Sequence, residues 1–117
     1  MVFYLNLVAC VATIAFGLFG FLAPRFTASA LDLTPTQSTM GLSEMRASVG
    51  GLFVASGIFA IIVNNPMAYT MIGIAFLGSV SGRILSLIFD APPIKKVILF
   101  GGIEAALSAW LILGNIA

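Results

Sequence analysis

The sequence contains no histidine, one cysteine and very few charged residues. Five of its 117 residues are Lys or Arg and four are Asp or Glu, so the net charge is +1. Without histidine the chain lacks the commonest general base, metal ligand and axial haem ligand. No basic surface is available to neutralise phosphates, which argues against nucleic-acid binding. We therefore expect no metal site and no cofactor, and we expect the lone Cys10 to be a small packing or lipid-facing residue.

Apolar residues dominate what is present. They make up 61% of the chain, and the mean hydropathy is +1.17, whereas a soluble domain carries about a quarter charged residues. A membrane-spanning helix needs about 20 mainly apolar residues. The sequence therefore predicts an all-α, integral membrane four-helix bundle in one domain, residues 1–117. Its helices are predicted over about residues 2–23, 42–63, 67–89 and 94–116.

Proline, asparagine and aspartate separate these apolar runs, because they favour turns or cannot continue a helix. A signal peptide is an alternative interpretation of the first run, since Ala28-Ser29-Ala30 resembles a cleavage site. However, no Lys or Arg precedes the run, and it is longer than the usual 7–15 apolar residues, so we expect a retained helix. Residues 24–41 form the longest connection and are rich in Ser, Thr and Pro, which predicts an exposed loop.

The basic residues outside the apolar runs indicate an orientation. Four spans place both termini and the 64–66 turn on one side, which has no Lys or Arg. The opposite side carries Arg25, Arg46, Lys95 and Lys96. By the positive-inside rule, the two longer connections are cytoplasmic and the termini periplasmic, in a bacterial inner membrane. Lys95 and Lys96 are expected to be membrane-surface anchors that contact headgroups.

Three aromatic residues near the span ends, Tyr4, Tyr69 and Trp110, are expected at the headgroup level of the terminal side.

Two charged residues lie inside the apolar runs. Arg83 is about six residues before the third run ends, and Glu104 is about eight residues after Lys96, so the two reach about 9 and 12 Å into the membrane from one side. The third and fourth runs are joined by a short hairpin and should be antiparallel neighbours. Since an unpaired charge at mid-bilayer costs at least about 2.5–3.5 kcal/mol, we predict that Arg83 and Glu104 pair.

The stretch GLSEMRASVGG brings Glu44 and Arg46 into the membrane from the same side. Residues two apart on a helix do not face each other, so each needs another partner. We predict a charged quartet of Glu44, Arg46, Arg83 and Glu104, with Asp90 at its rim. The pair of Arg83 and Glu104 is either a structural buried pair, a site for a headgroup, quinone or proton, or a contact with another subunit. Glu44 and Arg46 are alternatively an interfacial cap and a snorkelling side chain.

Small residues recur at helical spacing and predict close helix packing within this chain, with a second copy or with another protein. These residues are Ala47, Gly50, Gly51, Gly57, Gly78, Gly82, Ser86, Gly101 and Ser108.

Two motifs, LSEMRASVGG and SGRILSLIFDAPP, and a last helix with one glutamate resemble a bacterial family of small four-helix membrane proteins of unknown function. The matching positions are Leu42, Glu44, Arg46, Gly50, Gly51, Gly82, Arg83, Ser86, Asp90, Pro92 and Glu104. The resemblance implies a four-helix membrane fold and no established activity. Members often carry basic residues at the N-terminus or between helices two and three, which this chain lacks.

These features predict a non-catalytic accessory or structural subunit of a larger bacterial inner-membrane complex, such as a respiratory or photosynthetic one. Its partners would be the lipid bilayer and other membrane subunits or a second copy of itself. The alternative is a small module that binds or transports a hydrophobic or anionic molecule, such as a lipid or quinone, through the Arg/Glu cluster. An enzyme is disfavoured, because the carboxylates have no nucleophile, oxyanion site or metal beside them.

Overall fold

The computed structural model describes residues 1–34 and 36–116, and the regular structure in these ranges is entirely helical. Four stretches are long and apolar enough to cross a membrane: Val2–Leu22, Met40–Val63, Pro66–Phe89 and Ile94–Leu113. The predicted all-α fold with four membrane-spanning helices is confirmed. The chain forms two compact units, Leu7–Val63 and Met1–Asn6 with Asn64–Ala117, which are described in turn.

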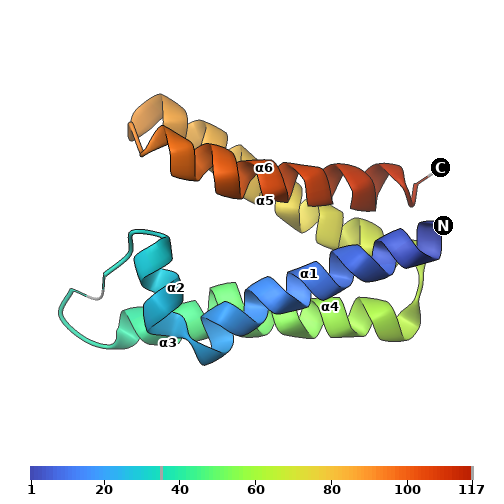
Figure 1. The fold of residues 1–117 in the computed structure, drawn as a ribbon, viewed down its shortest axis with the longest axis horizontal. Helices are drawn as coiled ribbons and strands as arrows, with labels where there is room; N and C mark the ends of the chain where they lie inside the picture. The colour runs from blue at the N-terminus through green and yellow to red at the C-terminus, as the bar shows by residue number, and fades with distance from the viewer. Residues whose placement is uncertain (35, 117) are drawn as a thin grey trace. The chain divides into compact units, whose positions relative to one another are not determined.

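The first unit contains most of α1 (Val2–Leu22) and the second membrane-spanning stretch (Figure 1). That stretch consists of α3 (Met40–Arg46), the π-helical turn η1 (Ala47–Gly51) and α4 (Leu52–Val63), which follow one another without a gap. A π-turn carries one extra residue in its ring and interrupts the regular α-helical ladder. Here it coincides with Gly50 and Gly51, whose helix propensity is low.

Part of the connection predicted as a loop is instead a short helix, α2 (Pro24–Ala30). Proline suits the first position of a helix, because its missing N–H would have no intrahelical acceptor there. Thr27 and Ala28 are buried, and the Thr27 hydroxyl donates to the Ala23 carbonyl at 2.9 Å. α2 packs against α3, so this segment closes one end of the first unit.

Glycines allow α1 to approach η1 closely. A Cβ atom built at Gly50 would lie 2.6 Å from the Phe21 backbone nitrogen, and one at Gly20 would lie 2.7 Å from the Val49 carbonyl oxygen. Backbone atoms cannot move away as the end of a side chain can. This contact therefore depends on glycine in both helices, as in small-residue packing of membrane helices generally.

The second unit is built on the hairpin of α5 (Pro66–Phe89) and α6 (Ile94–Leu113), which pack side by side (Figure 1). Asn65 caps the start of α5, where its side-chain oxygen accepts from the Met67 N–H at 2.8 Å. α5 ends at Asp90, and Ala91 then adopts a left-handed conformation with φ 48°. The following prolines prevent further helix and set the hairpin turn.

Hydrogen bonds fix the two helices of the hairpin against each other. The Ser108 hydroxyl donates to the Gly73 carbonyl at 2.9 Å, and a Cβ atom at Gly73 would lie 2.9 Å from the Leu111 Cβ. Tyr69, predicted at the headgroup level, is only 2% exposed, so its ring packs against this chain. Its hydroxyl donates to the Asn64 side chain at 2.7 Å, because a buried phenol needs a partner.

Candidate functional site

The α5–α6 hairpin carries an ion pair within its membrane-spanning helices. The Arg83 Nε donates to the Glu104 Oε1, and the two side chains are 32% and 14% exposed. The short Asp90–Pro93 connection makes α5 and α6 antiparallel neighbours, so residues about equally far from the turn meet. The predicted pairing of Arg83 with Glu104 is therefore confirmed.

Two residues of α6 position the arginine. A Cβ atom at Gly101 would lie 3.2 Å from the Arg83 Cδ, so glycine lets the aliphatic stem lie against α6. The Phe100 ring centroid lies 5.7 Å from the Arg83 Cζ, within the range of a cation–π contact. Both residues lie one helical turn before Glu104, so their contacts hold the arginine side chain against α6 beside the Glu104 carboxylate.

In the first unit, the Arg46 side chain forms a hydrogen bond with a backbone carbonyl. Its Nη1 donates to the Phe21 carbonyl at 2.7 Å. Phe21 lies in the last turn of α1, where carbonyls have no intrahelical donor and the helix dipole is negative. Arg46 therefore caps α1.

Glu44 is exposed and accepts a long hydrogen bond of 3.5 Å from the Ser48 hydroxyl, one turn further along. The sequence placed Glu44 in the first turn of its helix, but α3 begins at Met40, so Glu44 lies beyond that turn. Glu44 and Arg46 belong to the first unit, and Arg83 and Glu104 to the second. The single charged quartet stays a prediction.

The residues predicted around the quartet have separate local roles. Asp90 is exposed and ends α5, where its backbone N–H donates to the Ser86 carbonyl at 2.7 Å. Lys95 and Lys96 lie in the first turn of α6, beyond the hairpin turn, and Lys95 is exposed. This position at the end of a span is compatible with contact between the lysines and headgroups.

The predicted packing residues divide into two groups. Gly50, Gly57 and Ser108 are buried at helix contacts, and a Cβ atom at Gly57 would lie 2.6 Å from the Ile14 Cγ1. Gly51 makes only ordinary contacts at 3.5 Å or more. By contrast, no described atom lies within 4 Å of a Cβ atom built at Gly78 or Gly82. These two glycines lie on the exposed surface of α5, so of the three predicted kinds of contact, packing within the described chain is not seen for them, and contact with a second copy or another protein stays a prediction.

Two other predicted packing residues, Ala47 and Ser86, are not buried. Ala47 is exposed at the start of η1, and Ser86 is partly exposed. The Ser86 backbone carbonyl accepts the hydrogen bond from the Asp90 N–H that ends α5.

A comparison with family models matches residues 3–114 to the domain of unknown function DUF4345. This chain belongs to the DUF4345 family. The match covers nearly the whole chain and agrees with the resemblance to a small family of unknown function. No curated protein and no solved structure is similar enough to this DUF4345 protein to count as a match.

A network of side-chain amides and an indole, which was not predicted from the sequence, lies in the second unit of the DUF4345 fold. Asn6 is 3% exposed, and its Nδ2 donates to the Asn115 Oδ1 at 2.8 Å. The Asn6 Oδ1 accepts from the Asn115 Nδ2 at 2.8 Å and from the Trp110 Nε1 at 3.1 Å. The sequence signal was present, because an asparagine in an apolar run needs a partner as a charge does.

The chemistry available at these sites is ion pairing and hydrogen bonding. Within residues 1–34 and 36–116, no three His, Cys, Asp or Glu side chains are grouped so that they could hold a metal ion. The α5 surface around Arg83 and the open glycines is suited to contact with another helix.

Proposed function

We propose that this DUF4345 protein is a non-catalytic accessory subunit of a larger membrane assembly, and that α5 carries its contact surface. The observation behind the proposal is the combination of a mutually paired Arg83 and Glu104 with two open glycines on the same helix. The ion pair stabilises the hairpin from within. Gly78 and Gly82, one turn apart, leave a shallow surface that a partner helix can approach closely.

The partner is expected to be another membrane-spanning helix with small residues of its own. In lipid, apolar side chains gain little by leaving the acyl chains, so helix association depends on close packing and interhelical hydrogen bonds. The partly exposed Arg83 beside these glycines offers donors to a carbonyl or hydroxyl of that helix. We propose that the larger assembly is an energy-converting complex, respiratory or photosynthetic.

We further propose a bacterial inner-membrane location with periplasmic termini. Arg25, Arg46, Lys95 and Lys96 support this orientation, since basic residues favour the cytoplasmic side. A cysteine-accessibility test with an impermeant reagent on Ile116→Cys and Ser38→Cys checks it, because both residues are exposed. Labelling from the outside at position 116, and not at position 38, is the expected result.

The experiment that tests the subunit role is native co-purification of tagged variants. Gly82→Leu places a large side chain on the proposed contact surface, at a position where a Cβ atom has no described neighbour within 4 Å, and Gly102→Leu is the matched control on α6, where the same holds. We expect wild type and Gly102→Leu to retain the same partner chains in mild detergent, and Gly82→Leu to lose them at unchanged abundance. Purification of the wild-type chain alone, under conditions that preserve known membrane complexes, would contradict the proposal.

The alternative role, binding of a lipid or quinone through Arg83, is separated by Arg83→Leu. A structural arginine predicts lower abundance or loss of assembly. A ligand-binding arginine predicts normal abundance and assembly with loss of the bound molecule. We favour the structural role because Glu104 already accepts a hydrogen bond from Arg83.

A further inference from the structure

Two adjoining hollows lie in the first unit, where α2 and the residues after it meet α3 and η1. The wider one has a volume of about 510 Å³ and the narrower one of about 260 Å³. They share four lining residues, Ala28, Leu33, Thr34 and Leu42, so they form one continuous depression. The wider hollow alone lies within the usual range of small-molecule sites, about 300–1,000 Å³.

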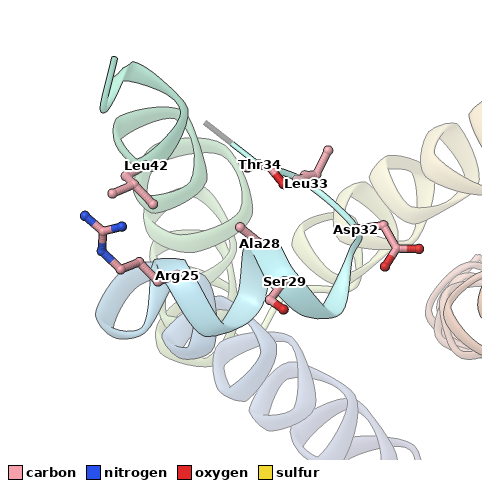
Figure 2. A pocket seen from close by; sticks show the side chains of 7 residues that line it. All are labelled: Arg25, Ala28, Ser29, Asp32, Leu33, Thr34 and Leu42. Carbon is pink, nitrogen blue, oxygen red and sulfur yellow. The ribbon is translucent and has the colours of Figure 1, made fainter. Parts of the chain in front are cut away.

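The two hollows differ in chemistry. The wider one is lined by Arg25, Ser29 and Asp32 in addition to the shared residues, and Figure 2 shows Arg25 and Asp32 on opposite sides of it. The narrower one continues between Leu42, Met45 and Val49. One end of the depression is therefore polar and contains a guanidinium, and the other end is apolar.

The depression also lies where two membrane-spanning helices end. α1 ends at Leu22, two residues before α2, and the second membrane-spanning stretch begins at Met40. The residues between them are thus at the boundary between acyl chains and headgroups. Phe26 and Leu33, 65% and 53% exposed, add apolar side chains at this level, as expected for a segment that lies at the membrane interface.

We propose that this depression binds one phospholipid of the surrounding leaflet. The lipid phosphate contacts the Arg25 guanidinium, and one acyl chain enters the narrower hollow past Leu42 toward Val49. Arg25 is the residue suited to a phosphate, because guanidinium donors match its oxygens. Glu44 lines the narrower hollow, and Asp32 lies across the wider hollow from Arg25. A phosphate beside Arg25 is therefore on the side of the depression away from Asp32 and outside the hollow that Glu44 lines.

A phospholipid fits this arrangement better than a partner helix or a soluble metabolite. A helix would need an apolar stripe much longer than the narrower hollow, and a soluble anion would leave that hollow unused. The proposal goes beyond the subunit role, because it concerns the first unit and not the α5 surface. Either can fail without the other.

The test is native mass spectrometry of the full chain, delipidated in detergent and titrated with phosphatidylethanolamine or phosphatidylglycerol. We expect one lipid to be retained per chain, and Arg25→Gln to weaken retention about tenfold. Gln37→Glu is the matched control, since it lowers the net charge by the same amount at an exposed residue that lines neither hollow, and it should leave retention unchanged. Equal weakening by both variants would show a general charge effect and overturn the proposal.

A second measurement locates the acyl chain. A phospholipid with a photoreactive group on the acyl chain should label peptides containing Leu42 and Val49 above all others, and Leu42→Trp, which fills the junction of the hollows, should abolish this labelling at unchanged helicity. Labelling spread evenly over the lipid-facing helices would overturn the proposal. Preference for one headgroup identifies the lipid class, whereas equal retention assigns recognition to the phosphate that both lipids share. Because Arg25 is exposed, its variant remains informative even if Leu42→Trp does not fold.

Discussion

Replacing Glu104 with leucine should destabilise the α5–α6 hairpin, because Arg83 would lose the carboxylate that accepts its Nε hydrogen. Arg83 lies about 9 Å inside the end of α5, at 1.5 Å per residue. An unpaired arginine at mid-bilayer costs about 2.5–3.5 kcal/mol on insertion scales. Its side chain is 32% exposed, and its stem can extend toward the interface. We therefore expect a smaller loss of unfolding free energy, about 1–2 kcal/mol.

The partner substitution, Arg83→Leu, should also destabilise the hairpin, by about 1 kcal/mol, because Glu104 would lose the hydrogen bond that it accepts from Arg83. The double variant joins two leucines across the hairpin and should lie near the wild type, since replacement of a whole buried ion pair by apolar residues is often neutral or stabilising. The expected coupling energy between the two sites is therefore about 2–3 kcal/mol.

The assay is reversible unfolding of the full chain in mixed micelles, followed by far-UV circular dichroism as the denaturing detergent increases. Phe100→Leu serves as a reference for the cation–π contact alone, with an expected loss of about 0.5–1 kcal/mol. Additive single-variant losses, with the double variant less stable than either single variant, would refute the argument that the pair is mutually satisfied.

Three further variants test the packing of the two units. Gly50→Ala should lower the unfolding free energy by about 1–3 kcal/mol in the same assay, because its Cβ would meet the Phe21 backbone, whereas Gly102→Ala should change it little; equal effects would contradict the close contact. Asn6→Leu should cost about 1–3 kcal/mol by leaving buried amide and indole donors without acceptors, and unchanged Trp fluorescence would argue against the network. Ala91→Gly should raise the thermal midpoint, because Ala91 adopts a left-handed conformation that costs a residue with a side chain about 1–2 kcal/mol and that glycine adopts freely. The greater flexibility of glycine in the unfolded state offsets only about 0.4–1 kcal/mol of this stabilisation. A lower midpoint would refute this prediction.

The four membrane-spanning helices and the Arg83–Glu104 pair were predictable because each depends on short-range information. Run length and apolar composition define a span, and a four-residue hairpin turn fixes which residues of α5 and α6 face each other. The positions of Arg83 and Glu104 relative to that turn were then enough to predict their contact, which the structure describes.

Partner choice among small residues was not predictable in the same way. A stripe such as Gly78 and Gly82 indicates that a helix surface is flat, but it does not indicate which element packs against that surface. In the described part of the chain, no atom lies within 4 Å of a Cβ atom built at either glycine. Conversely, Gly17 and Gly20 were passed over although a Cβ atom at either would lie within 3 Å of atoms in η1 or α4. Helical spacing describes one helix, whereas a packing contact depends on two.

The amide network shows that neutral polar groups in apolar helices need hydrogen-bond partners, as charged groups do. Asn6 is 104 residues from Trp110 and 109 residues from Asn115 in sequence, so no local pattern links it to them. However, burial without a hydrogen-bond partner costs free energy for any polar group in an apolar environment, as it does for Arg83. An asparagine side chain has two donors and an acceptor to satisfy. Asn6 in the first apolar run and Asn115 at the end of the last were therefore candidates for each other, because an even number of spans brings both termini to the same side. The same reasoning gives Trp110 a second role. Its indole N–H is satisfied by Asn6, so the residue closes a polar contact within its unit, a role that its amphipathic ring and its place near a span end did not indicate.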